Sequence, residues 1–83
     1  PLPADGKRGT TGAPQVFPMV QISGRILQFA PGGTIIDQNN RFIVHGSLPQ
    51  QADVYFTQDP AGLVMRLYVL TPIEQERLNR AGR

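Results

Sequence analysis

The chain has 83 residues, which suffice for one small domain that buries roughly 60 to 65% of its extended surface. A large enzyme core is therefore excluded, and the absence of Cys excludes disulfides, thiolate zinc sites and thiol nucleophiles. Hydrophobic residues make up 40% of the chain and charged residues 17%, so the sequence is too apolar for a disordered tail.

The formal net charge of +2 is concentrated near the two ends of the chain. Between positions 20 and 70, three Arg residues are balanced by three Asp residues, so no basic stripe crosses the predicted fold. This distribution argues against a nucleic-acid footprint. No run approaches the roughly 18 to 20 apolar residues of a transmembrane helix, so we expect no transmembrane segment in the sequence.

The N-terminal region has a distinct composition, with four Pro and three Gly among residues 1–19 and no apolar periodicity. Such a composition is typical of flexible linkers. We therefore predict a flexible N-terminal arm over residues 1–19, followed by a single small β domain over residues 20–83.

From position 20 onward, short runs of β-branched and aromatic residues alternate with turn signals. They predict five strands, at residues 20–29, 34–37, 41–46, 52–57 and 63–70. Gly24 interrupts the alternation of the first run, which predicts a bulge or bend in that strand. Pro31 and Gly32 fit the two central positions of a type II turn, and residues 37–41 fit a short hairpin loop.

The last two predicted strands are joined by Asp-Pro-Ala-Gly at residues 59–62, which favours a type I turn and a hairpin. A bulge at Gly62 would place Phe56 opposite Arg66, whereas a plain four-residue loop would place Phe56 opposite Met65. In either register both faces of the last strand are largely apolar. A second layer should therefore cover it: the far side of a barrel, the C-terminal helix or a partner molecule.

A helix is expected at the C-terminus, because Thr71 and Glu74 form a capping box with Pro at the first helical position. It should run over about residues 72–80 and dock through Ile73 and Leu78. The predicted fold is thus all-β with one short C-terminal helix. Its strands form a small five-stranded antiparallel barrel, SH3-like or OB-like, or alternatively an open meander packed by the helix.

Residue types that carry catalysis or bind metals are sparse and form no motif. His45 is the only histidine, and a triad with a Ser and an Asp is permitted by composition but favoured by nothing else. Residues 37–48 lack the Gly and the final acid of a calcium loop, and the Gly32-Gly33 pair precedes a strand and not a helix. We therefore predict no catalytic residue, no metal site and no cofactor.

The remaining candidate is a binding surface of aromatic and Arg side chains, formed by Tyr55, Arg66 and Tyr68. Such side chains stack on bases or anchor protein interfaces. The alternative is core packing, in which Phe56 and Tyr68 fill the barrel and the aliphatic part of Arg66 covers them.

Several short motifs resemble a group of short exported proteins of Gram-negative bacteria with no assigned activity. In chain order they are residues 3–9 (PADGKRG), 29–32 (FAPG), 36–37 (ID), 40–41 (NR), 48–49 (LP), 59–62 (DPAG), Arg66 and residues 70–72 (LTP). The resemblance implies a signal peptide removed upstream of Pro1 and a location in the periplasm. It implies no catalytic residues.

Two functions follow as hypotheses. The first is a non-catalytic periplasmic structural or protein-interaction module, whose partner is another protein or a second copy in weak self-association. The second is an OB-like domain that binds single-stranded nucleic acid, which the charge distribution disfavours.

Overall fold

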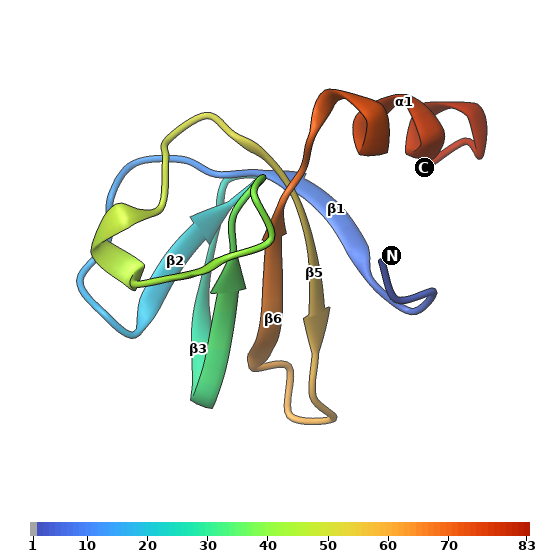
Figure 1. The fold of residues 1–83 in the computed structure, drawn as a ribbon. Helices are drawn as coiled ribbons and strands as arrows, with labels where there is room; N and C mark the ends of the chain where they lie inside the picture. The colour runs from blue at the N-terminus through green and yellow to red at the C-terminus, as the bar shows by residue number, and fades with distance from the viewer. Residues whose placement is uncertain (1) are drawn as a thin grey trace.

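The computed structural model describes residues 2–83, a mostly β chain with one short C-terminal helix (Figure 1). The elements, in chain order, are β1 (Lys7–Thr10), β2 (Met19–Ile22), β3 (Arg25–Ile36), β4 (Phe42–Ile43), the 3-10 helix η1 (His45–Ser47), β5 (Asp53–Gln58), β6 (Val64–Val69) and α1 (Pro72–Arg80). The predicted fold class, all-β with a C-terminal helix, is confirmed.

The six strands form one strongly curled, half-barrel sheet in the order β1-β5-β6-β3-β2, and β4 pairs with the end of β3. β3 and β6 run parallel and the other pairs are antiparallel, so the sheet is mixed instead of the predicted five antiparallel strands. An isolated bridge between Thr11 and Ile22 brings the chain after β1 back to β2. The non-sequential order excludes a meander, and the sheet is a half-barrel.

β2 and β3 form a hairpin, where the sequence analysis expected one bent strand over residues 20–29. Ser23 and Gly24 have positive φ angles of 51° and 79°, the combination that a two-residue type I′ turn requires. The interruption at Gly24 is therefore a chain reversal and not a bulge.

The predicted turn at Pro31 and Gly32 is a bend inside β3, which continues to Ile36. Gly32 has the expected positive φ of 77°. The pairing with β6 shifts between Phe29 and Thr34, so the segment between these residues is a large bulge. Because bulges bend the strand that carries them, this segment contributes to the curl of the sheet.

The hairpin between β5 and β6 forms as predicted, because Gly62 donates a hydrogen bond to the Asp59 carbonyl over 2.9 Å. The register predicted with a bulge at Gly62 holds next to the turn, where Gln58 pairs with Val64, but neither predicted partner of Phe56 is correct. Thr57 pairs with Arg66 and Phe56 with Leu67, because a second irregularity lies between the turn and these pairs. This shift buries Leu67 with Phe56 and leaves Arg66 exposed.

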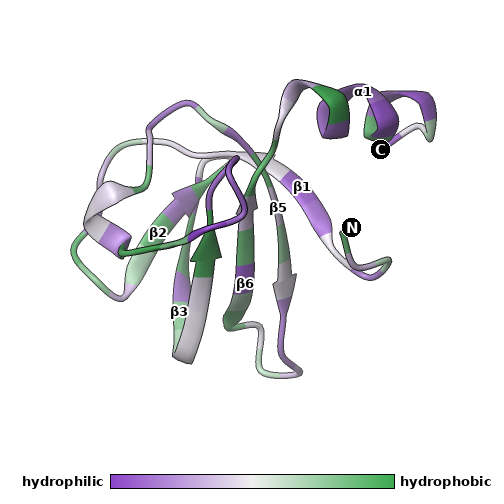
Figure 2. Cartoon of the chain, viewed as in Figure 1, coloured by the Kyte–Doolittle hydropathy of each residue, from purple (hydrophilic) through white to green (hydrophobic). Residues whose placement is uncertain are grey.

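Apolar side chains on the inner face of the sheet form the core. They are Val20, Ile22, Phe29, Ile35, Val54, Phe56, Val64, Leu67 and Val69. A smaller cluster lies outside the curled sheet, where Tyr55 and Leu70 pack with Leu78 of α1. α1 therefore covers Tyr55 and Leu70 at one end of the sheet and not the whole of the last strand. Figure 2 shows that most of the helix is hydrophilic.

The flexible arm predicted over residues 1–19 is wrong for residues 7–10, because these form β1 and pair with β5. The Gly residues here permit close packing. A Cβ atom at Gly6 would lie 2.2 Å from Cε2 of Tyr55, and one at Gly9 would lie 2.4 Å from Cγ2 of Ile22. Pro1 lies outside the described residues.

α1 begins with the predicted capping box. The Glu74 amide donates to Oγ1 of Thr71 over 3.1 Å, and the Thr71 amide donates to Oε1 of Glu74 over 3.0 Å. Leu78 is buried, but Ile73 is 65% exposed and does not anchor the helix as expected. The reason is geometric, because residues five positions apart point about 140° away from one another around a helix.

Candidate functional site

The three residues predicted to form one binding surface lie in two different environments. Tyr55 and Tyr68 are opposite one another on β5 and β6, on the outer face of the sheet. Tyr55 is only 1% exposed, because α1 and the N-terminal segment cover it. Arg66 is exposed and Tyr68 is half-buried. Tyr55 therefore belongs to the packing of the fold, and Arg66 and Tyr68 remain available to a ligand.

The Tyr55 hydroxyl holds both ends of the chain. It donates to the Pro3 carbonyl over 2.6 Å and accepts from the Gly6 amide over 3.1 Å. It also accepts from Nη2 of Arg83 over 2.8 Å, and the Arg83 guanidinium lies 5.3 Å from the centre of the Tyr55 ring. These contacts explain the burial of Tyr55 and engage its hydroxyl group within the fold.

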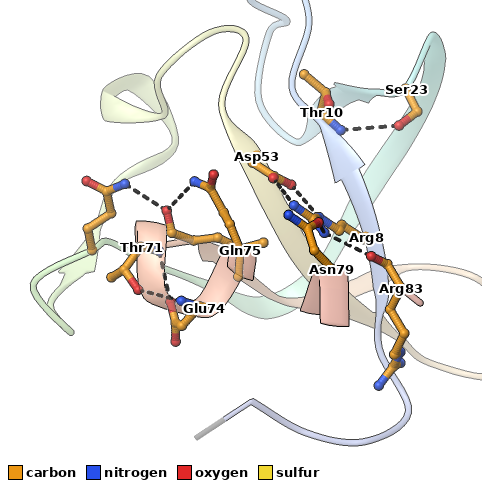
Figure 3. A network of polar contacts seen from close by, with 11 residues as sticks. Arg8, Thr10, Ser23, Asp53, Thr71, Glu74, Gln75, Asn79 and Arg83 are labelled. Atoms are coloured by element: carbon orange, nitrogen blue, oxygen red, sulfur yellow. Dashed lines mark hydrogen bonds and ion pairs between the residues drawn. The ribbon is translucent and has the colours of Figure 1, made fainter. Parts of the chain in front are cut away.

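A second set of polar contacts joins β1, β5 and the end of α1 (Figure 3). Nε of Arg8 donates to Oδ1 of Asp53 over 2.9 Å, and Nη2 of Arg8 pairs with the second carboxylate oxygen. Nη1 of Arg8 donates to Oδ1 of Asn79 over 2.6 Å. The hydrogen bond to Asp53 raises the pKa of Arg8. The Coulombic attraction of Asp53 also raises this pKa, whereas desolvation lowers it. Arg8 therefore stays charged and ties the helix to the sheet.

Arg66 and Tyr68 lie on the wall of a groove of about 520 Å³ over β3, β4 and β6. The groove is lined by Gly32, Thr34, Ile36, Asn40, Phe42, Met65, Arg66 and Tyr68. We call it the β3–β6 groove. Arg66 is its only cationic side chain.

The strand register arranges the outer face over β3 and β6 in two rows. Arg66 lies between its partners Thr57 on β5 and Thr34 on β3. Tyr68 is paired with Ile36 of β3. The first row therefore combines a guanidinium with two hydroxyl side chains, and the second row is apolar and aromatic.

Phe42 extends the second row, because it pairs with Ile36 at the edge of the sheet. Its side chain is 78% exposed, and Met65 on the same groove is 40% exposed. Sequence reasoning missed both residues as site candidates. The available signal was the predicted hairpin loop at residues 37–41, which places Phe42 opposite Ile36. That pattern does not indicate whether the side chain is exposed.

A second hollow, of about 230 Å³, adjoins the groove beside the start of α1. Ile36, Asn40 and Tyr68 line both hollows, so the two hollows adjoin at these residues, and together we call them the furrow. The second hollow also contains Asp37 and Glu74. One end of the combined furrow is therefore cationic and the other end acidic.

His45 lies in η1, away from this furrow. Its Nε2 is 2.6 Å from the Met19 carbonyl oxygen, and its ring has edge contacts with Phe17 and Phe29. These contacts give His45 a structural role. Among residues 2–83, no group of three or more His, Asp or Glu side chains could hold a metal ion.

Comparison of the chain with protein-family models, curated proteins and solved structures gives no match. Within the described part of the chain, no helix has the length and apolar character needed to cross a membrane. The site must therefore be interpreted from its own geometry.

Proposed function

We propose that the chain is a non-catalytic protein-interaction module of the periplasm that binds another protein through the β3–β6 groove. The observation that carries the proposal is the exposure of Phe42 and Met65 on the same groove as Arg66 and Tyr68. Exposed apolar side chains grouped on one groove and rimmed by polar residues are typical of interaction sites. Aromatic, Met and Arg side chains are also the types enriched in protein interfaces.

The charge of the groove favours a protein over a nucleic acid. Sites for single strands combine stacked aromatic rings with a positively charged channel that follows the phosphate backbone. Here Arg66 is the only cation on the lining, and the adjoining hollow contains the acidic side chains Asp37 and Glu74. A polyphosphate backbone would be repelled at that end of the furrow.

One observation supports an OB-like single-stranded nucleic-acid-binding domain as the second candidate. The rings of Phe42 and Tyr68 line the same groove as Arg66, and rings beside a guanidinium can stack on bases. The two candidates differ in their salt dependence, because binding to several phosphates releases counterions and weakens steeply as salt rises.

The periplasmic location rests on the resemblance to short exported proteins. Release of the chain from cells by osmotic shock, together with a periplasmic marker enzyme, would support this location. Retention with a cytoplasmic marker would contradict it.

Site-specific photocrosslinking tests the interaction in cells. A benzophenone amino acid replaces Phe42 in the groove or, as the control, Ile26, which is 50% exposed but does not line the groove. We expect a protein adduct of defined mass from position 42, absent from position 26 and lost with Tyr68→Ala. Adducts of equal yield from both positions, or none from position 42, would overturn the proposal.

The second candidate is tested with the purified chain and a labelled single strand of roughly 20 nucleotides. Under the protein-interaction proposal, binding is negligible at physiological salt. A complex that weakens steeply between low and moderate salt, and is lost with Arg66→Gln, would favour the nucleic-acid function instead.

A further inference from the structure

We infer that the furrow binds an extended segment of a partner protein. The segment has an acidic side chain at position i, an apolar side chain at position i+2 and a basic side chain at position i+4. The inference rests on the proposed function and names the chemistry of the partner. It is carried by the charges and spacing of the furrow.

The cationic end selects a carboxylate. Arg66 is exposed, and Thr34 and Thr57 flank it as its ladder partners on the same face of the sheet. A guanidinium binds a carboxylate through two parallel hydrogen bonds, and hydroxyl groups can donate to the same oxygens. An Asp or Glu side chain of a partner therefore fits this row.

The other end selects a cation. Asp37 and Glu74 are both half-buried beside the adjoining hollow. Oδ1 of Asp37 accepts from the Arg41 amide over 2.9 Å, and Oε1 of Glu74 accepts from the Thr71 amide over 3.0 Å. The second carboxylate oxygen of each takes no part in these bonds. Two ion pairs form within residues 2–83, Arg8 with Asp53 and Arg80 with Glu76. Neither involves Arg66, Asp37 or Glu74.

The spacing of the furrow matches an extended chain. Arg66 and Tyr68 are two residues apart on β6, which corresponds to about 6.6 Å. From Thr34, opposite Arg66, to Asp37, which directly follows β3, the path along the strand is about 10 Å. Side chains at i, i+2 and i+4 of an extended peptide share one face and lie about 6.6 and 13 Å apart. An extended segment whose position i lies at Arg66 therefore places position i+2 near Tyr68 and position i+4 about 13 Å along, towards the hollow that Asp37 and Glu74 line.

The probe is the capped peptide Thr-Glu-Thr-Val-Thr-Lys-Thr, titrated into the isotope-labelled full chain and followed by amide chemical shifts. Two further peptides replace Glu or Lys by Gln. A composition-matched peptide, Thr-Thr-Glu-Val-Lys-Thr-Thr, places the three side chains on adjacent positions, so they cannot all face the furrow. We expect shifts confined to the furrow, and weaker binding of each control peptide by about three- to tenfold.

Two protein variants assign each charge. Arg66→Gln should abolish the difference between the Glu and Gln peptides and retain the effect of replacing Lys. Glu74→Gln should reduce the effect of replacing Lys, and it preserves the capping box, since Gln serves equally at that position. This pairing of protein and peptide changes forms a double-mutant cycle, so a general loss of folding cannot imitate the result.

The failures of the two proposals are distinguishable. If all four peptides shift the furrow residues with equal affinity, the charge pattern is wrong, while the groove remains an interaction surface. If none shifts them, the inferred segment is overturned, and the crosslinking experiment at position 42 still decides whether the groove binds a protein of other chemistry. Shifts spread over the whole chain would also contradict the inference.

Discussion

Tyr55→Phe removes one oxygen atom and should destabilise the protein much more than such a change does at a surface. The hydroxyl accepts from the Gly6 amide in a buried position and from Arg83, and it donates to the Pro3 carbonyl. Loss of an acceptor for a buried amide costs about 1 to 3 kcal/mol. Arg83 retains the Gly6 carbonyl as an acceptor, so its loss adds little. We expect a decrease of about 2 kcal/mol in the free energy of unfolding.

Such a decrease is large for this chain, because a domain of this length has a stability of about 4 to 12 kcal/mol. It should lower the melting temperature by roughly 8 to 16 °C in a calorimetric or circular-dichroism experiment. The amides of β1 should also exchange faster with solvent, because Gly6 directly precedes this strand. Tyr68→Phe is the matched control, because Tyr68 lies opposite on β6 and is half-buried. Equal melting temperatures of the two variants would refute the role assigned to Tyr55.

Three further changes test how the terminal segments are held. Gly6→Ala should lower the melting temperature by roughly 5 °C or more, because the new Cβ would overlap the Tyr55 ring; an unchanged midpoint would mean that this packing is wrong. Arg8→Gln should reduce the free energy of unfolding, measured in urea, by about 1 to 3 kcal/mol, because it leaves Asp53 without its charged partner. Equal urea midpoints of the variant and the natural chain would show that the ion pair contributes nothing to stability. Thr71→Ala should cost about 0.5 to 2 kcal/mol by removing the cap of α1, whereas Thr71→Ser should be nearly neutral; equal losses in both would contradict the capping role.

Local sequence signals predicted much of the fold. The hairpin at residues 59–62 and the start of α1 follow from side chains that bond to neighbouring backbone groups, so a short window of sequence contains all their partners. The parallel pairing of β3 with β6 could not be predicted in this way, because it joins segments about 30 residues apart and depends on which strands curl together. The N-terminal strand was missed because Gly residues that permit close packing have the same composition as a flexible linker.

The candidate site was predicted only in part. Arg66 and Tyr68 could be selected from residue type, since both lie in a predicted strand with surplus apolar surface. Their separation from Tyr55 depends on where α1 and the N-terminal segment dock, and that docking uses contacts such as Arg8 with Asn79 over 71 positions. Phe42 lies in the site because it pairs with Ile36. The predicted loop at residues 37–41 implied this pairing, but no local pattern indicated that the Phe42 side chain would be exposed.

The central claim is that the β3–β6 groove serves binding and not folding. Its most direct test compares crosslinking from position 42 in the natural chain and in Arg66→Ala, with the melting temperature of each protein measured in parallel. Because Arg66 is exposed and forms no ion pair within residues 2–83, the melting temperature should change by less than about 2 °C. The yield of the adduct should fall by about fivefold or more. An unchanged adduct yield in a protein of unchanged stability would contradict the claim.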